Sequence, residues 1–239
     1  MKIAHLGGKV NRVNNEIRVL DKAGNVVNSA EVTNDDVITP VAFAYWTNTG
    51  SSPISSFDTT WSVPPVPDTN HGQSIFLFPA ILSADHHAIL APVLQYGPSE
   101  AGGGSYWSVA SWYFDGGMAY FTPPVGIAVG KPLNGVITLL PTQDVYGYVA
   151  SFHSIEGTEL PVTGIEKLVF ATEGLGAVHT ISSFDYPSGS VVFSPINVQT
   201  SSGIPSVTWV PVNDTAAGLI TTVDIQGASN ASVTINFPA

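Results

Sequence analysis

The stretch that decides the fold is residues 89–114, which read ILAPVLQYGPSEAGGGSYWSVASWYF. Two apolar runs, 89–97 and 106–114, flank a Gly-rich connection, a pattern that predicts two strands joined by a loop. Side chains alternate between the two faces of a strand, so Gln95 shares a face with Val93. A carboxamide among apolar neighbours is either a hydrogen-bonded core group or the polar floor of a binding groove.

The same alternation places Trp107 on one face with Val109, Ser111 and Tyr113. These aromatic side chains can line a groove or belong to the core, and about half of the rings in the region must be core because alternate positions face opposite ways. The rings alone therefore leave both interpretations open.

The composition of the whole chain indicates an all-β protein. Its 239 residues include 23 Gly and 18 Pro, which separate short runs rich in Val, Ile, Thr, Phe and Tyr. Turn signals recur every 8 to 12 residues or so, a spacing typical of two packed antiparallel sheets in a sandwich. The length fits one such domain.

We expect about fourteen strands in the body of the chain. They are predicted near 43–46, 57–63, 74–82, 89–97, 106–114, 118–121, 135–140, 146–153, 167–173, 178–182, 190–198, 206–212, 219–225 and 232–237. Residues 161–165 are expected to form at most one turn of helix.

Residues 1–40 differ from residues 41–239, which we take as the sandwich domain. Residues 16–27 predict a β-hairpin with a Gly-containing turn, and the polar residues 31–39 predict a linker. This N-terminal segment is either an extra hairpin on the sandwich or a removable leader. The first fifteen residues show neither the apolar core nor the cleavage pattern of a signal peptide, so the chain is either intracellular or begins after its signal.

Charge limits the partners of the protein. The net charge is −11, only 10% of residues are charged, and Lys131 and Lys167 are the only basic residues after position 40. Such a body repels nucleic acid and anionic membranes. A surface with few ion pairs also has few salt bridges to lose on acidification, which favours tolerance of low pH, although a weakly charged surface solvated by Ser, Thr and Asn explains the same composition.

Several reactive groups are excluded or weakly supported. The chain has no cysteine, which excludes disulfides, thiolate catalysis and zinc–thiolate sites. Neighbouring His86 and His87 point to opposite faces of a strand, so we expect no metal and no other cofactor. His153 and His179 fit structural roles, and no Gly-x-Ser-x-Gly elbow supports a serine triad.

Glu173 is the most informative acid. It follows the apolar run 167–172 and shares a face with Val169 and Ala171. A carboxyl on an apolar face tends to have a raised pKa and is a candidate general acid or base. The alternative is a residue at the strand end that reaches water just before Gly174.

The order of these features resembles the eqolisins, the fungal glutamic peptidases. The resemblance rests on Trp46, the run Phe57–Pro64 that ends in Val-Pro, the Leu-Gln-Tyr-Gly of 94–97, the Gly-Ser-Tyr…Trp-Tyr of 104–113, and the 22 positions between Glu173 and Pro195. It spans about residues 43–237. It implies a β-sandwich of two curved sheets, like a concanavalin-type jelly roll, with a substrate groove on the concave sheet.

The resemblance also implies a mechanism. Gln95 matches the family's catalytic glutamine and Glu173 its catalytic glutamate, which takes a proton from water and later protonates the leaving amine. The Gln amide would stabilise the oxyanion. We expect the two side chains to face each other across an open groove, and the groove to be lined by Trp107, Tyr113, Ser111, Trp46 and Phe76.

The chain departs from the family at the groove. Trp107 and Ser111 stand where the family tends to place carboxylates, and residues 76–91, where a groove-lining Trp is expected, do not align cleanly. The leading hypothesis is an acid endopeptidase acting on peptides, in an extracellular or acidic compartment as the resemblance implies. The alternatives are a carbohydrate-binding, lectin-like protein that uses Trp107, Trp112 and nearby Tyr, or a storage or toxin-like protein. The oligomeric state stays open.

Overall fold

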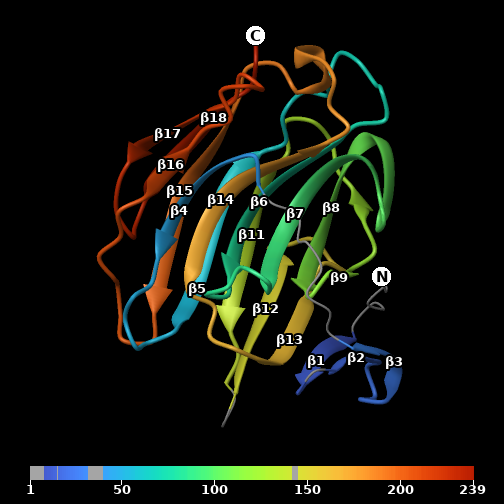
Figure 1. Ribbon diagram of the computed structural model, residues 1–239, viewed down its shortest axis with the longest axis vertical. Helices are drawn as coiled ribbons and strands as arrows, with labels where there is room; N and C mark the ends of the chain where they lie inside the picture. Colours follow the sequence, from blue (N-terminus) through green and yellow to red (C-terminus); the bar gives the residue numbers. More distant parts are fainter. Residues whose placement is uncertain (1–7, 15, 32–39, 142–144) are drawn as a thin grey trace.

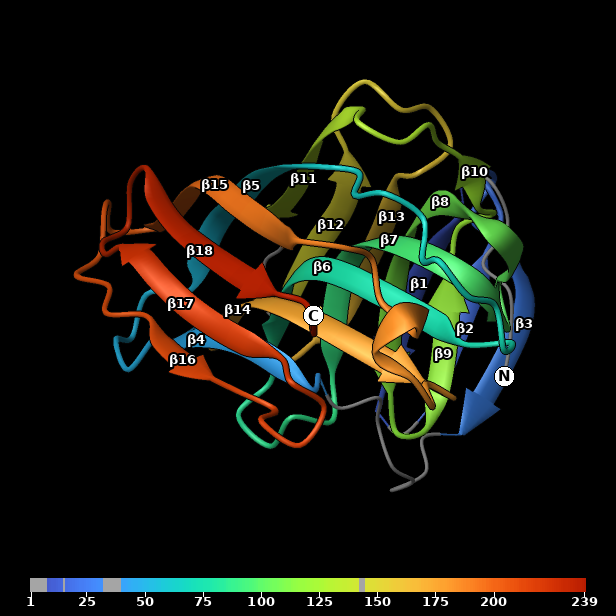
Figure 2. The same cartoon turned by 90° about the horizontal axis from the view of Figure 1, so that it is seen from above.

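The structure, a computed structural model, describes residues 8–14, 16–31, 40–141 and 145–239. Two sheets pack face to face in it, which confirms the predicted β-sandwich (Figures 1 and 2). Apart from one short 3-10 turn, η1 (Ser183–Asp185), the regular elements of the described residues are strands. Among those residues no helix is long and apolar enough to cross a membrane.

The larger sheet has ten strands in the spatial order β17-β18-β15-β5-β11-β12-β13-β1-β2-β3. Their bounds are β17 (Ile220–Ile225), β18 (Ala231–Asn236), β15 (Ser190–Thr200), β5 (Ile54–Ser62), β11 (Pro132–Leu139), β12 (Tyr146–Phe152), β13 (Leu160–Ile165), β1 (Lys9–Val13), β2 (Glu16–Leu20) and β3 (Val26–Glu31). Its neighbouring strands are antiparallel except for β1 and β13, which pair in parallel.

The eight-stranded sheet contains the stretch 89–114 as two neighbouring strands, β7 and β8. Seven strands follow the order β10-β8-β7-β6-β14-β4-β16, and β9 also pairs with β8. Their bounds are β10 (Val125–Gly126), β8 (Gly102–Asp115), β7 (Ile89–Ser99), β6 (Ser74–Leu82), β14 (Phe170–Val178), β4 (Ala42–Thr47), β16 (Val210–Val212) and β9 (Met118–Phe121).

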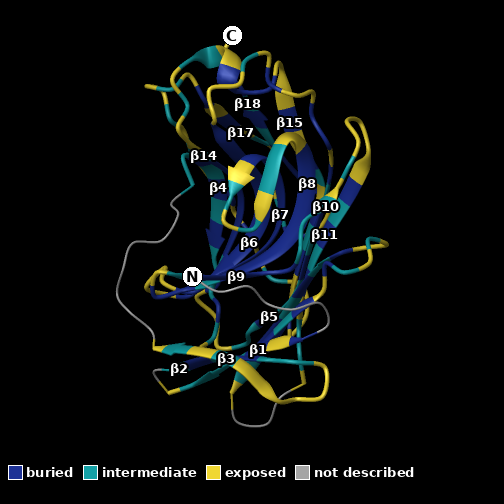
Figure 3. Cartoon of the chain, turned by 90° about the vertical axis from the view of Figure 1, so that its right-hand side faces the viewer, coloured by how far each residue is buried: buried dark blue, intermediate teal, exposed yellow. Residues whose placement is uncertain are grey.

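The main core lies between the two sheets, whose strands are largely coloured as buried in Figure 3. Its largest fully buried side chains include Trp61, Trp107 and Trp209. The sheets approach closely at Gly135, where an added Cβ would lie only 2.9 to 3.0 Å from atoms of Pro92, Pro79 and Trp61. We call the side of the eight-stranded sheet turned away from this core the outer face. A second apolar cluster covers it, built on β6, β7, β8 and β9.

Most predicted strands are found within a few residues of their expected positions, and two predictions are wrong. Residues 161–165 belong to strand β13, which pairs with both β12 and β1, because its neighbours satisfy its backbone groups. The strand expected at 178–182 does not form, because β14 continues to Val178 and the chain then bends into η1. The sequence Pro-Thr-Gln-Asp at 141–144 also predicts a turn, of which residues 142–144 lie outside the described part of the chain.

The predicted N-terminal hairpin is present as β2 and β3, and β1 joins it to the large sheet through β13. A side-chain contact adds to this attachment: Arg12 Nη1 lies 2.8 Å from Asp115 Oδ2, and Tyr113 donates a hydrogen bond to the same oxygen at 2.6 Å. The division at residue 40 stays a prediction, because residues 1–7, 15 and 32–39 lie outside the described part of the chain.

Candidate functional site

The register of the eight-stranded sheet decides which residues share its outer face. Glu173 of β14 pairs with Pro79 of β6, whereas Gln95 of β7 pairs with Phe76 of β6. Positions 76 and 79 of one strand point to opposite faces. Phe76 belongs to the outer cluster, so Gln95 lies on the outer face and Glu173 points into the sandwich.

Glu173 is sealed between the sheets. Its side chain is fully buried, and Thr59 Oγ1 from β5 of the opposite sheet donates a hydrogen bond to Oε1. Oε2 has no hydrogen-bond partner among the described residues. Desolvation raises the pKa of Glu173 well above its ordinary value, with a further upward contribution from Asp58, while the Thr59 hydrogen bond acts in the opposite direction. Burial therefore favours the neutral acid over the carboxylate.

The side-chain amide of Gln95 forms hydrogen bonds within the β7–β8 hairpin. Nε2 donates to the carbonyl oxygens of Gly97 and Gly102 at 2.8 and 2.9 Å, and Oε1 accepts from Ser99 Oγ at 2.9 Å. Gly103 has φ +104°, and an added Cβ there would lie 2.5 Å from Gln95 Nε2, so glycine permits this close approach. Both amide hydrogens are engaged, and the side chain ties the hairpin together.

The prediction that Gln95 and Glu173 face each other across an open groove is therefore wrong. The physical reason is the pairing of each strand with β6, which turns the two side chains to opposite faces of one sheet. Each of them is buried, with exposed fractions of 2% and 0%.

Most of the residues expected to line the groove also point inward. Trp46, Trp107 and Tyr113 belong to the main core, and Ser111 lies between Val109 and Tyr113 in alternation with them. They are therefore not groove residues, because their face of the sheet is covered by the ten-stranded sheet. Phe76 lies on the outer face, opposite to the other four, so the five residues do not line one groove.

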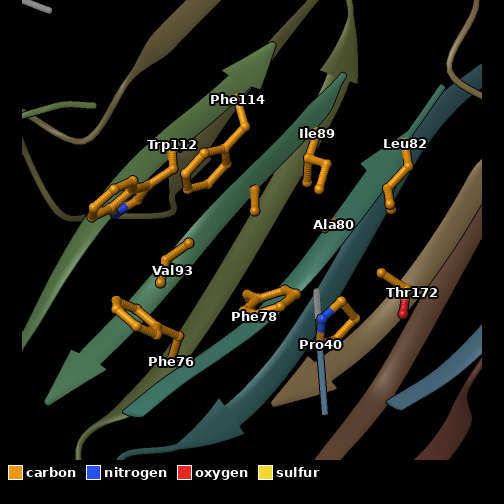
Figure 4. Close-up of a pocket in the computed structure, with 11 residues that line it drawn as sticks. Pro40, Phe76, Phe78, Ala80, Leu82, Ile89, Val93, Trp112, Phe114 and Thr172 are labelled. Atoms are coloured by element: carbon orange, nitrogen blue, oxygen red, sulfur yellow. The ribbon is translucent and has the colours of Figure 1, made fainter. Parts of the chain in front are cut away.

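A pocket does open on the outer face, and Figure 4 shows how its side chains stand on the strands. The cavity itself has a volume of about 30 Å³, and the wider space of about 470 Å³ between its lining atoms includes open solvent. We call it the outer pocket. Its lining residues are Pro40, Phe76, Phe78, Ala80, Leu82, Ile89, Ala91, Val93, Trp112, Phe114 and Thr172.

The outer pocket is apolar. Nine of its eleven lining residues have no charged or hydrogen-bonding side-chain group. The other two are Trp112, which has an indole N–H, and Thr172, whose hydroxyl donates to the Ala44 carbonyl oxygen. The Trp112 ring stacks on Phe114, with centroids 5.4 Å apart and planes at 15°, and meets Phe76 edge-on at 6.2 Å and 77°. These contacts fix the aromatic wall in one arrangement.

The sequence interpretation missed Phe78, Leu82 and Ile89 as pocket residues. The run SIFLFPAIL of β6 is buried along its whole length, so it has no alternation of apolar and polar residues that would mark one face as exposed. Positions 75, 77, 79 and 81 on the other face are apolar as well, so the sequence of β6 offers no local signal that identifies the pocket residues.

A polar cluster lies apart from the outer pocket, at η1. Asp185 Oδ1 is 2.7 Å from His71 Nδ1 and accepts from Thr69 Oγ1 at 2.6 Å, while Oδ2 accepts from the backbone N–H groups of Ile181 and Ser182. Desolvation alone would raise the pKa of Asp185, but these hydrogen bonds outweigh it and lower the pKa to about 2. These hydrogen bonds hold the loop before β6 against η1.

The described residues contain no group of three or more His, Asp or Glu side chains arranged to hold a metal ion. His86 instead packs its ring on Phe170, with centroids 4.4 Å apart.

No family model matches the sequence, and no curated protein matches it. Solved structures do match. A crystal structure of scytalido-glutamic peptidase with a peptide-based transition-state analog aligns over 84% of this chain and 100% of that one, with a TM-score of 0.56 and 13% identity. SCP-B, an eqolisin in complex with the tripeptide Ala-Ile-His, aligns over the same shares with a TM-score of 0.51 and 12% identity. The chain therefore has the fold of the eqolisin peptidases.

Proposed function

We propose that this protein is a ligand-binding variant of the eqolisin fold that takes up an extended apolar molecule in the outer pocket. The observation that carries the proposal is the apolar lining of that pocket. Small-molecule sites are typically concave and lined mostly by apolar and aromatic side chains, as this pocket is. Burial of apolar surface contributes roughly 25 cal/mol per Å², so such a pocket favours a ligand with little polar surface.

The positions of the polar groups support binding without hydrolysis. A general acid or base must come within hydrogen-bond reach of the substrate or of a water beside it. Glu173 points away from the outer pocket and is completely buried, and the Gln95 amide is occupied by the hairpin. The residue of β14 that faces the pocket beside Glu173 is Thr172, which cannot replace a carboxylate as an acid or base.

The character of the pocket also separates an apolar chain from a sugar or a peptide. A sugar needs polar partners around its hydroxyl groups, and a peptide brings N–H and C=O groups that are costly to bury without partners. The only hydroxyl in the lining, on Thr172, is already bonded to Ala44. An apolar chain has no repeated polar groups, so its binding incurs neither of these desolvation costs.

A titration with the fluorescent apolar probe N-phenyl-1-naphthylamine tests the proposal. We expect the probe to bind the wild type with a rise in fluorescence, and Ala80→Phe to abolish the rise because the new ring fills the pocket from its floor. Val192→Phe is the matched control, since Val192 is 45% exposed on the other sheet. Equal binding by wild type and Ala80→Phe, with both folded by circular dichroism, would contradict the proposal.

Acid peptide hydrolysis is the second candidate, favoured by the likeness to peptidases that were solved with peptide ligands. Casein cleavage at pH 3 to 4 tests it, with Glu173→Gln as the comparison. From the placement of Glu173 we expect no cleavage above background in either protein. Cleavage by the wild type that disappears in Glu173→Gln would replace the binding proposal with a glutamic peptidase mechanism.

A further inference from the structure

We infer that the ligand of the outer pocket is an apolar chain with one uncharged oxygen acceptor, such as an alkyl ketone, aldehyde or ester, and that this oxygen accepts a hydrogen bond from the Trp112 indole N–H. The inference rests on the proposed function and specifies the chemical class of its ligand. Ser108 Oγ, on the same face of β8 but outside the pocket lining, is a second buried hydroxyl without a partner among the described residues.

Two buried polar atoms on the outer face have no hydrogen-bond partner among the described residues. Trp112 Nε1 and Ser108 Oγ are buried, in side chains 2% and 1% exposed, and neither finds a partner among the described residues. A buried donor without a partner costs about 1–3 kcal/mol, so native structures rarely leave one unsatisfied. Both atoms have almost no accessible surface, so each recovers this energy only if a ligand displaces the groups that cover it and supplies an acceptor.

The location of these two atoms distinguishes them from the other buried polar atoms without partners. The others in the described residues belong to side chains that face the main core: Trp61, Trp107, Ser111, Tyr120, Tyr148 and Glu173. Trp112 lines the outer pocket. Ser108 precedes it by four positions on the same face of β8, opposite Gln95 of β7 and outside the eleven lining residues.

The atom types determine what the ligand must offer. The indole nitrogen of Trp is a donor only, and a hydroxyl can donate as well as accept, so an oxygen acceptor satisfies both. The acceptor should be uncharged, because no basic side chain lines the pocket and the protein as a whole carries a net charge of −11. A carboxylate buried there would have no partner for its charge.

The shape of the pocket sets the direction of the ligand. In Figure 4 the Trp112 ring lies near Phe76 at one end of the pocket, whereas Ile89 and Leu82 stand towards the other end. The oxygen is therefore placed at the Trp112 end. The apolar chain runs along Val93 and Phe78 towards Leu82.

Displacement of N-phenyl-1-naphthylamine by dodecane, 2-dodecanone and dodecanoate tests the inference, since the three compounds share a chain and differ at one end. We expect 2-dodecanone to bind the wild type most tightly. Trp112→Phe keeps an aromatic ring but removes the N–H, so it should weaken 2-dodecanone about tenfold while leaving dodecane unchanged. Ser108→Ala is a smaller change that should weaken the ketone selectively as well.

The outcomes separate the inference from the proposed function. If none of the compounds, nor the probe, binds the wild type, the proposed function fails. If dodecane and 2-dodecanone bind equally, or if both variants leave the preference for the ketone intact, the pocket is apolar but the hydrogen bond is not formed and the inference fails. Tighter binding of dodecanoate than of 2-dodecanone would overturn the assignment of an uncharged acceptor.

Discussion

The wild type is expected to lose stability as the pH rises above about 4, and Glu173→Gln should abolish a large part of this loss. Glu173 is fully buried, and desolvation raises its pKa in the folded state. In the unfolded chain the same carboxyl titrates near its ordinary pKa of about 4.3. Gln cannot ionise, and its carbonyl oxygen can still accept the hydrogen bond from Thr59.

The sign follows from proton binding. Between the unfolded and folded pKa values of Glu173, the folded state binds more protons than the unfolded state, so the free energy of unfolding falls as the pH rises. One such group contributes a slope of at most about 1.4 kcal/mol per pH unit. Its stabilising effect is complete below the unfolded pKa and is lost as the pH rises towards the folded pKa.

Other acids change how strongly the free energy of unfolding depends on pH, but they do not reverse its fall above about pH 4. Desolvation also raises the pKa of Asp115 and of Glu166, so both add to the fall above pH 4 and should leave a residual slope in the variant. Asp185, with its pKa lowered to about 2, acts the other way and at lower pH: its contribution is lost as the pH falls from about 4 towards 2.

Urea unfolding at pH 4, 5, 6 and 7 measures the effect. We expect wild type and Glu173→Gln to be similar at pH 4 and the variant to be the more stable at pH 7. Glu156→Gln, which changes an exposed loop carboxyl, is the matched control and should follow the wild type. Parallel curves for wild type and Glu173→Gln would show that Glu173 is solvated in solution, contrary to its placement here.

Arg12→Ala is expected to give the second large effect, a loss of about 2–3 kcal/mol in the free energy of unfolding. Removing one partner of a buried ion pair typically costs about 3–5 kcal/mol. The cost is smaller here because the Arg12 side chain is 24% exposed. The Asp115 carboxyl, only 1% exposed, would keep its hydrogen bond from Tyr113 but lose its charge partner. The attachment of β1–β3 to the sandwich would weaken.

The same strands supply a matched control. Arg18 pairs with Glu16 at 2.7 Å on the surface, and Arg18→Ala should change stability little, because exposed pairs contribute little. Urea unfolding gives the stability of each variant, and limited proteolysis reports on the release of residues 8–31. If Arg12→Ala behaves like Arg18→Ala, the Arg12–Asp115 contact does not hold the N-terminal strands.

The sequence correctly predicted how side chains are grouped along each strand. Gln95 does share a face with Val93, and Glu173 does share a face with Ala171, as alternation requires. What alternation cannot supply is which of the two faces meets the core when both are apolar. In β6 every residue is buried, so the pattern of that strand marks neither face as exposed.

The separation of Gln95 from Glu173 could not be predicted for a related reason. It depends on the register of β7 and β14 against β6, and a shift of one residue exchanges the two faces of a strand. Strand β13 was missed because its six residues, LPVTGI, carry Pro and Gly and pair with a strand from the distant N-terminus. The local sequence of a strand does not reveal such long-range pairing.

The most direct test of the central claim is to locate a bound apolar ligand by NMR, from cross-relaxation between the chain protons of 2-dodecanone and assigned aromatic protons of the protein. The account predicts contacts to the rings of Phe76, Phe78 and Trp112 on the outer face. Contacts confined to exposed side chains elsewhere, such as Ile181 and Phe184, would contradict it. So would a ligand that binds without perturbing the three pocket rings.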